Sequence, residues 1–367
     1  MRIAFLGTPE VAVPALEALV GTDDVDIVAV ITNPDRPRGR RGTPQPPPVK
    51  VAAEQHGLEV WQPAKPREVL AELRALDLDA CAVVAYGALL PRDVLDAGGR
   101  GMVNLHFSLL PRWRGAAPVQ HALRAGDEVT GVTTFVLDEG MDTGPVLDTL
   151  EVPIEPDVSA GALLERLAAL GAPVLVDSLR RLVDGQQPTP QPAEGATLAP
   201  KIAPEDVAID FTDTARGVVD LARSADPAPG AHTTFRGKRL KIYRAEVTGV
   251  SEVAEDADDA GGDDSATPAG ARPGEVVARD RTGVVVATGD RPVRLLMVQP
   301  EGKARMDGAA FANGYRPEPG ERFGPDGQDD DGQDADGPGA DGPGASGQDE
   351  AAPGGGANAG GAPDVRG

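Results

Sequence analysis

The chain has 367 residues, 40% of them hydrophobic, with a formal net charge of −23 and a single cysteine, Cys81. Its length suffices for two domains with separate cores. One cysteine excludes an intrachain disulfide or a cysteine-cluster metal site, and we expect it to be buried and inert. No apolar run is long enough to cross a bilayer, and no secretory signal is indicated, so we expect a cytoplasmic protein without a membrane partner.

The first half of the chain alternates between buried strands and helices. Helical spacing in residues 10–20, 49–57 and 68–76 separates continuous apolar runs of the kind found in parallel strands: RIAFLG, DIVAVIT, DACAVVAYG and GMVNLHF. A helix is then predicted at APVQHALRAG, two β segments at VTGVTTFVL and PVLDTLEVPI, and a long helical region over 160–185 that is broken at Gly-Ala-Pro. This order predicts an α/β domain over 1–186, with a Rossmann-like, mostly parallel sheet.

The second half has a different pattern. Residues 187–206 are Pro-rich and are predicted to be a linker. A helix at TARGVVDLARSA is followed by short alternating strands, HTTFRGKRLKIYRAEV, GEVVARD, GVVVATGD and VRLLMVQP. Short strands joined by Gly-Asp turns indicate a small, OB-like C-terminal β-barrel over 207–324.

Most of the negative charge lies in two stretches that lack large apolar residues. Residues 251–273 contain seven acidic residues and one arginine, and residues 325–367 contain ten acidic residues and one arginine. Such compositions cannot bury enough apolar surface to fold. We therefore interpret 251–273 as an acidic insert in the barrel and 325–367 as a disordered acidic tail. The net charge does not exclude a local basic surface that binds nucleic acid.

Two kinds of bound group are not expected. The turn after the first strand, FLGTPE at 5–10, has one glycine where the dinucleotide fingerprint has three, which argues against NAD. The four histidines are scattered along the chain, so a metal site is not expected either.

A polar pair closes one of the buried strands. Asn104 and His106 are two residues apart, so their side chains share one face of the strand. They fall at its carboxyl end, where open α/β sheets bind ligands. Taken alone, the pair fits ordinary structural roles better, as a loop cap and a packed core histidine.

Two neighbouring motifs favour a site. In SLLPRWRG at 108–115, Pro111 follows two leucines, so we expect extended backbone whose amides can meet a ligand. In the loop DEGMDTGP at 138–145, Asp142 is placed to reach His106, fix its tautomer and raise its pKa. Each feature is weak alone, and the combination is specific.

The chain resembles the methionyl-tRNA formyltransferase family along nearly its whole folded length. The resemblance is carried by RIAFLGTPE, TNPDRPRGR, VVAYG, NLHFSLLPRWRGAAPVQ, DEGMDTG, PAPGAHTTFRGKRLKIYRA and VQPEGKARM. The Asn-x-His pair, the S-L-L-P-x-x-R-G turn and the D-T-G triplet mark the wider group of formyltetrahydrofolate-dependent formyltransferases. The PDRPRGR loop and the C-terminal β-domain narrow the group to the members that act on tRNA.

The resemblance implies transfer of the formyl group of 10-formyltetrahydrofolate to the α-amino group of methionyl initiator tRNA, for translation initiation. It assigns Asn104 as a donor to the developing oxyanion, and His106 as a stabiliser of the same charge or a proton shuttle. Asp142 would orient His106 and accept the ammonium proton; which of the two is the immediate base stays open. The residues implied in folate binding are Tyr86, Gly87, Ser108, Leu109, Leu110, Pro111 and Arg114, with a surface salt bridge the alternative role for Arg114.

Basic residues imply a tRNA partner, bound by a monomer. The Pro/Gly loop at 34–42 and the C-terminal β-domain supply the cations, which we expect to contact phosphates without reading sequence. They are Arg36, Arg38, Arg40, Arg41, Arg236, Lys238 and Lys303. One alternative is a formyltetrahydrofolate-dependent N-formyltransferase acting on a small amine, which needs no such cations. The other is a non-catalytic RNA-binding protein, which needs no oxyanion donor beside a histidine.

Overall fold

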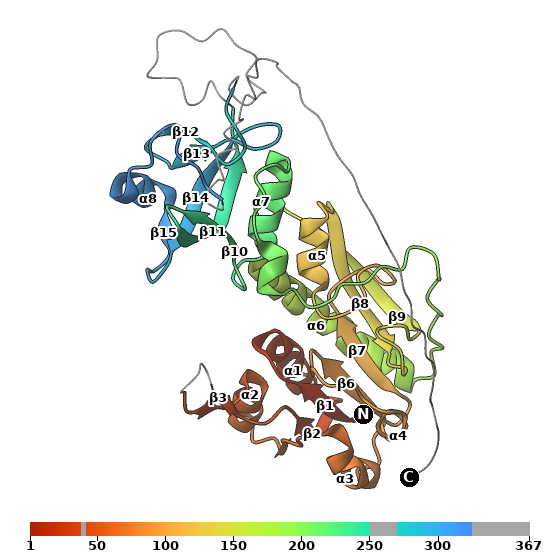
Figure 1. Cartoon of the computed structure of the whole chain (residues 1–367). Coiled ribbons are helices and arrows are strands. Elements are labelled where there is room, and N and C mark those ends of the chain that lie inside the picture. The colour runs from red at the N-terminus through yellow and green to blue at the C-terminus, as the bar shows by residue number, and fades with distance from the viewer. Residues whose placement is uncertain (38–41, 250–269, 325–367) are drawn as a thin grey trace, which may run out of the picture. The chain divides into compact units, whose positions relative to one another are not determined.

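The computed structural model describes residues 1–37, 42–249 and 270–324 (Figure 1). Arg38, Arg40 and Arg41 of the predicted basic loop lie outside the described residues. The predicted acidic tail and the acidic insert, except for residues 270–273, also lie outside them.

The N-terminal part is built on a seven-stranded sheet in the order β5-β2-β1-β6-β7-β8-β9. The first five strands of this order are parallel, whereas β8 and β9 are antiparallel to their neighbours. The predicted mostly parallel, Rossmann-like sheet is therefore confirmed. The strands are β1 Arg2–Gly7, β2 Asp26–Ile31, β5 Val60–Trp61, β6 Ala80–Val84, β7 Met102–His106, β8 Val129–Val136 and β9 Val146–Pro153, and a separate hairpin pairs β3 Arg36–Pro37 with β4 Pro44–Gln45.

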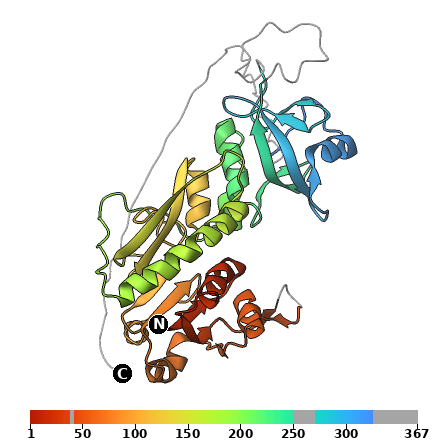
Figure 2. The ribbon, with the colours of Figure 1, turned by 180° about the vertical axis from the view of Figure 1, so that it is seen from behind.

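Helices cover both faces of this sheet. One buried cluster joins α1, α2 and α6 to the strands, and a second joins α3 and α4 to the opposite face; Figure 2 shows α6 running along the sheet. In the described residues no helix is both long and apolar enough to cross a membrane. The helices are α1 Val13–Val20, α2 Pro48–Gln55, α3 Leu70–Ala75, α4 Arg92–Leu95, α5 Pro118–Arg124 and α6 Ala160–Val183, with 3-10 turns η1 Glu10–Ala12 and η2 Pro66–Val69.

The predicted break in the long helix is wrong. Helix α6 runs without interruption from its N-cap, Ser159, and carries Pro173 in its interior. Proline removes one helical hydrogen bond, but the apolar face around it is packed against the sheet, and tertiary packing outweighs propensity. At Gly171 a Cβ atom would lie 2.9 Å from Leu105 of β7, so glycine here allows the helix to approach the strand that carries the candidate site.

The prediction of an inert cysteine is confirmed. Cys81 lies in β6 and is fully buried. Burial raises the pKa of its thiol to about 12, so the reactive thiolate is suppressed at neutral pH.

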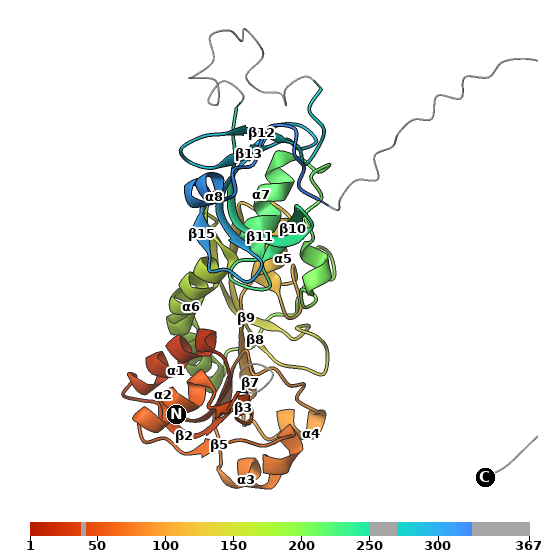
Figure 3. The same cartoon turned by 60° about the vertical axis from the view of Figure 1, so that its left-hand side comes forward.

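The C-terminal part contains a six-stranded antiparallel sheet, β10-β11-β14-β13-β12 with β15 paired to β14 (Figure 3). Phe323 bridges to Phe235 of β10 and Arg322 bridges to Glu275 beside β12. The last described segment thus links the two edges of the sheet, as expected for the predicted barrel-like domain. Its elements are β10 Ala231–Phe235, β11 Lys238–Val247, β12 Val276–Arg279, β13 Val284–Val286, β14 Val293–Pro300, β15 Met306–Asp307, η3 Pro204–Val207, α7 Ala215–Ser224 and α8 Gly308–Tyr315.

A buried ion pair stabilises α7. Asp220 accepts a hydrogen bond from Arg223 at 2.7 Å, and both side chains are only 5% exposed. Arg216, one turn earlier, donates to the other carboxylate oxygen at 2.9 Å. Removing Asp220 would leave the Arg223 guanidinium buried without its partner charge.

We therefore expect Asp220→Ala to lower the free energy of unfolding by about 3–5 kcal/mol, the usual cost of leaving a buried charge unpaired. Urea unfolding followed by circular dichroism measures this change. Asp96→Ala is the control, because the Arg92–Asp96 pair on α4 is exposed and should contribute less than about 1 kcal/mol. Equal losses in the free energy of unfolding for the two substitutions would contradict a stabilising role of the buried pair.

Candidate active site

The predicted polar pair lies at the carboxyl end of β7. In the ladder with β8, Asn104 stands opposite Phe135 and His106 opposite Thr133, so both side chains leave the strand on the same face. His106 is only 6% exposed, and its ring packs edge-on to Phe135. Asn104 is half-buried, and its side-chain amide has no hydrogen-bond partner among the described residues. A buried imidazole therefore lies beside an amide that is available to a ligand.

The structure brings Asp142 to His106, as the sequence predicts. Asp142 Oδ2 lies 3.7 Å from His106 Nδ1, and the Asp142 side chain is 18% exposed. The other ring nitrogen, Nε2, lies 2.9 Å from the carbonyl oxygen of Trp113. A carbonyl can only accept, so Nε2 carries the proton in neutral His106 and Nδ1 presents its lone pair beside the carboxylate.

Asp142 raises the pKa of His106, as predicted, but the net shift of this pKa is downward. Burial lowers its pKa below the ordinary value for histidine, and this effect exceeds the opposing attraction of Asp142 and the hydrogen bond to Trp113. The reason is that removing the imidazolium from water costs more free energy than the attraction of one carboxylate at 3.7 Å restores. His106 is therefore neutral at neutral pH and able to accept a proton.

A titration of His106 tests the direction of this pKa shift. The imidazole of His106 should take up a proton only below the usual histidine range, and Asp142→Asn should move its titration to still lower pH, because the carboxylate that opposes burial is lost. NMR titration of the four histidine ring signals, with His106→Ala for assignment, measures the midpoint. A midpoint above the ordinary value would contradict the assignment.

The loop after β7 is a turn and not the expected extended segment, and the Leu110 amide that was expected to be free is occupied. The Leu110 N–H donates to Thr133 Oγ1 at 3.1 Å, and Thr133 in turn donates to the Ser108 carbonyl at 2.7 Å. The Arg112 N–H closes the turn onto the Leu109 carbonyl. The neighbouring strand β8 thus satisfies the Leu110 amide, which cannot be offered to a ligand.

The remaining residues predicted for folate binding fall into two groups. Tyr86 and Gly87 follow the end of β6, next to β7 in the sheet; Tyr86 is buried and Gly87 is exposed. Ser108, Leu109, Leu110 and Pro111 form the turn after β7. Both groups are therefore at the carboxyl ends of adjacent strands, beside Asn104.

Arg114 has a partner that the sequence did not suggest. Its guanidinium donates from two nitrogens to Gln191 Oε1, at 3.1 and 2.6 Å. Gln191 belongs to the segment interpreted as a Pro-rich linker, and the only sequence signal was a glutamine between two prolines. A surface salt bridge, the alternative role for Arg114, is absent from the described residues.

Comparisons with known proteins identify the family of the chain. The formyl transferase family profile matches residues 1–179, and the profile of the formyl transferase C-terminal domain matches residues 201–316. A methionyl-tRNA formyltransferase of Streptomyces coelicolor is 48% identical over 328 residues, which cover 88% of this chain and 100% of the relative. The chain belongs to the methionyl-tRNA formyltransferase family. The family and enzyme class predicted from the motifs are therefore confirmed.

Solved structures show the same fold at low identity. An N-formyltransferase of Helicobacter canadensis, in complex with folinic acid and dTDP-3-aminofucose, has a TM-score of 0.58 at 16% identity and covers 82% of this chain and 99% of its own. HypX of Aquifex aeolicus, in complex with tetrahydrofolic acid, has a TM-score of 0.54 at 18% identity and covers 86% of this chain. This chain spans about half the length of that HypX, 47%.

Basic residues predicted to contact tRNA in this member of the methionyl-tRNA formyltransferase family lie in both parts of the chain. Arg36 is exposed on β3, and Lys238 and Lys303 are exposed at the start of β11 and in the turn after β14. Arg236 is exposed, but its guanidinium already pairs with Glu321 at 2.8 Å. A phosphate at Arg236 would have to compete with that carboxylate, whereas the two lysines have no recorded ion pair among the described residues.

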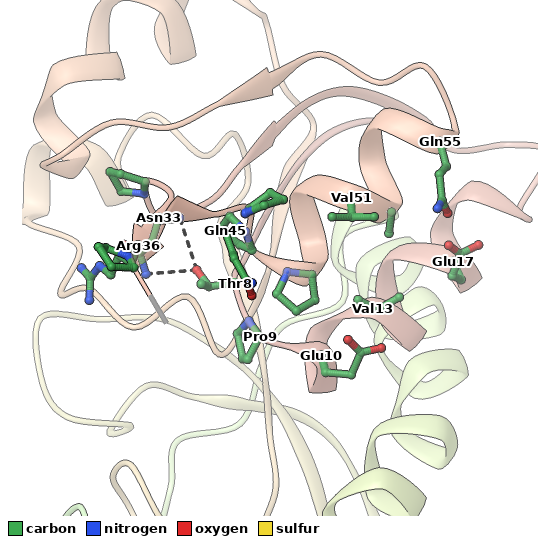
Figure 4. A pocket seen from close by; sticks show the side chains of 16 residues that line it. Thr8, Pro9, Glu10, Val13, Glu17, Asn33, Arg36, Gln45, Val51 and Gln55 are labelled. Atoms are coloured by element: carbon green, nitrogen blue, oxygen red, sulfur yellow. Dashed lines mark hydrogen bonds between the residues drawn. The ribbon is translucent and has the colours of Figure 1, made fainter. Parts of the chain in front are cut away.

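A pocket of about 650 Å³ opens next to the hairpin β3–β4 (Figure 4). It is lined by Thr8 and Asn33, which hydrogen-bond to each other at 3.1 Å, and by Arg36 and Gln45 of the hairpin. The pocket lies at the carboxyl ends of β1 and β2, the same edge of the sheet as His106. None of the three predicted catalytic residues lines it.

Proposed function

We propose that this chain transfers the formyl group of 10-formyltetrahydrofolate to the α-amino group of methionyl initiator tRNA, with Asn104, His106 and Asp142 as the catalytic residues. The chain's membership of the methionyl-tRNA formyltransferase family supports the reaction. The observation that supports the site is the buried His106, whose Nδ1 lies 3.7 Å from Asp142 Oδ2, on the same strand face as the Asn104 amide.

The first chemical step joins the two substrates. The methionyl α-amino nitrogen attacks the formyl carbon, and the carbonyl oxygen becomes an oxyanion in a tetrahedral intermediate. The Asn104 amide N–H donates to this oxyanion, and because the amide has no other partner among the described residues, the donor is ready before the charge develops.

The attacking amine must then lose a proton. His106 Nδ1 accepts it, because the Trp113 carbonyl holds the only ring proton of neutral His106 on Nε2. The Asp142 carboxylate stabilises the imidazolium that forms. This carboxylate is already in place, because its Oδ2 accepts a hydrogen bond of 2.7 Å from the Gly115 N–H. His106 then returns the proton to N10 of the folate as the N10–carbon bond breaks, and tetrahydrofolate leaves.

We propose 10-formyltetrahydrofolate as the formyl donor. Two proteins of this fold are described in complex with tetrahydrofolic acid and with folinic acid, which supports a folate-derived formyl donor. We assign its pterin to the turn 108–111 and the end of β6 at Tyr86 and Gly87. Turnover should occur with 10-formyltetrahydrofolate and be absent with the 5-formyl isomer, whose formyl group is on a different nitrogen. Equal rates with both donors would overturn the assignment.

Transfer to a small amine is the disfavoured alternative. The N-formyltransferase bound to an amino-sugar nucleotide shares only the fold, at 16% identity, whereas the methionyl-tRNA formyltransferase of S. coelicolor is 48% identical over 88% of this chain. A small acceptor does not need the exposed lysines of that part.

The salt dependence of tRNA binding tests this acceptor. Changing Lys238 and Lys303 together to alanine should weaken binding at low salt and reduce the slope of log K against log salt by about two, roughly one for each lost phosphate contact. Filter binding of methionyl initiator tRNA between low and moderate salt measures the slope. Lys65→Ala, an exposed lysine before η2, is the control and should leave it unchanged. The same slope in the double variant would exclude phosphate contacts at these lysines.

A further inference from the structure

The segment predicted as a linker lies against both loops of the candidate active site. The Arg114 N–H, in the loop after β7, donates to the Thr197 carbonyl at 2.9 Å. Thr189 exchanges two backbone hydrogen bonds of 2.7 Å with Val146, directly after the loop that carries Asp142. Residues 189–199, called the strap below, therefore connect two loops that are distant in sequence.

One side chain of the strap joins the two loops directly. Gln191 Oε1 accepts two hydrogen bonds from the guanidinium of Arg114, at 3.1 and 2.6 Å. Gln191 Nε2 donates to the carbonyl oxygens of Asp142 and Gly144, at 2.9 and 2.7 Å. The amide thus uses both lone pairs and both protons, which is its full hydrogen-bonding capacity.

The loop held by Gln191 has a backbone conformation that requires support. Asp142 has φ +53°, in the left-handed region that non-glycine residues seldom occupy. Its carboxylate accepts the Gly115 N–H, and the strap passes so close that a Cβ on Gly115 would lie 2.6 Å from the Ala199 carbonyl oxygen. Gln191 holds the carbonyl at the same residue, so the carboxylate and the backbone of Asp142 are both fixed.

We propose that Gln191 is a positioning residue for formyl transfer, which holds the Asp142 loop so that the carboxylate faces His106 Nδ1. This inference rests on the proposed roles of His106 and Asp142. Among the described residues, Gln191 hydrogen-bonds to neither the His106 ring nor the Asp142 carboxylate, and it acts through the Asp142 and Gly144 carbonyls. Without those two hydrogen bonds the loop can relax to an ordinary conformation and carry the carboxylate away from the imidazole.

Gln191→Glu keeps the contact with Arg114 and removes the two hydrogen bonds to the Asp142 loop. A glutamate still accepts from Arg114, but it cannot donate to the two carbonyl oxygens and repels them. We expect kcat to fall about ten- to hundredfold, as when a catalytic group is displaced by about 1 Å, with the KM for methionyl-tRNA nearly unchanged. Gln191→Met, which has similar length and no charge, should show the same loss.

Gln187→Glu is the matched control, because Gln187 is exposed just before the strap and, among the described residues, its side chain bonds only to the Gly185 carbonyl. It introduces the same charge and should leave kcat unchanged. Thermal unfolding of the full chain should give closely similar midpoints for the three variants and the native protein. A wild-type kcat for both Gln191 variants would overturn the proposal.

A double-mutant cycle distinguishes positioning from general damage. In the Asp142→Asn background the carboxylate is already gone, so Gln191→Glu should lower single-turnover rates by less than about twofold. The same factor in both backgrounds would show that Gln191 does not act through Asp142. If Asp142→Asn alone had the native rate, the proposed role of Asp142 would fail, and with it this inference. A slow Asp142→Asn with an independent Gln191 effect would overturn the inference alone.

Discussion

Replacing Asn104 with alanine will lower kcat by about a hundredfold to a thousandfold, the usual loss when one donor to a developing oxyanion is removed. The amide is half-buried on the face of β7 next to His106, and no described residue occupies it. Its contribution therefore appears mainly in the transition state, so the KM values should change little. Single-turnover formylation of methionyl-tRNA at saturating donor measures the effect.

Asn313→Ala is the control for this loss. Asn313 is exposed on α8 in the C-terminal part, and its truncation should leave the rate unchanged. An Asn104→Ala variant with a rate within about threefold of the native protein would remove the amide from the mechanism, because a lost oxyanion donor costs far more.

Replacing His106 with alanine will lower kcat by about a hundredfold to ten-thousandfold, the range found for general acid–base groups. In the proposed mechanism the neutral ring accepts the amine proton at Nδ1, because its Nε2 is held by the Trp113 carbonyl. The acid limb of the rate profile should also disappear in this variant. Rates measured from weakly acidic to weakly alkaline pH give both observations together.

The control for this second prediction is His56→Ala. His56 is an exposed histidine that pairs with Glu17 at the surface, and its loss should change neither the rate nor the pH profile. An acid limb that persists in His106→Ala would assign the titrating group elsewhere.

The strands and most of the site could be predicted because local pattern decides them. Continuous apolar runs gave the parallel strands, and a two-residue spacing on one of them placed Asn104 and His106 on one face. The motif around Asp142 brought the third residue to the same edge, where the structure also has it. These features depend on neighbours in sequence and on the general rule for ligand sites in open sheets.

The errors arose where a distant segment supplies the deciding contact. The sign of the net His106 pKa shift depends on the burial of its ring, and the Leu110 amide is occupied by Thr133 of β8. The interior Pro173 of α6 is tolerated because the sheet packs against that helix. Likewise Gln191 acquires its partners only when the strap folds back onto the catalytic loops. Local composition does not predict such contacts.

The most direct test of the central claim is one acceptor assay. The full chain is incubated with 10-formyltetrahydrofolate and, in separate reactions, with methionyl initiator tRNA, free methionine, an amino-sugar nucleotide or water alone, and formyl transfer is followed by mass spectrometry of each acceptor. Formylation of methionyl-tRNA alone is the predicted result. Transfer to the amino-sugar nucleotide, or release of formate in water at a comparable rate, would contradict it.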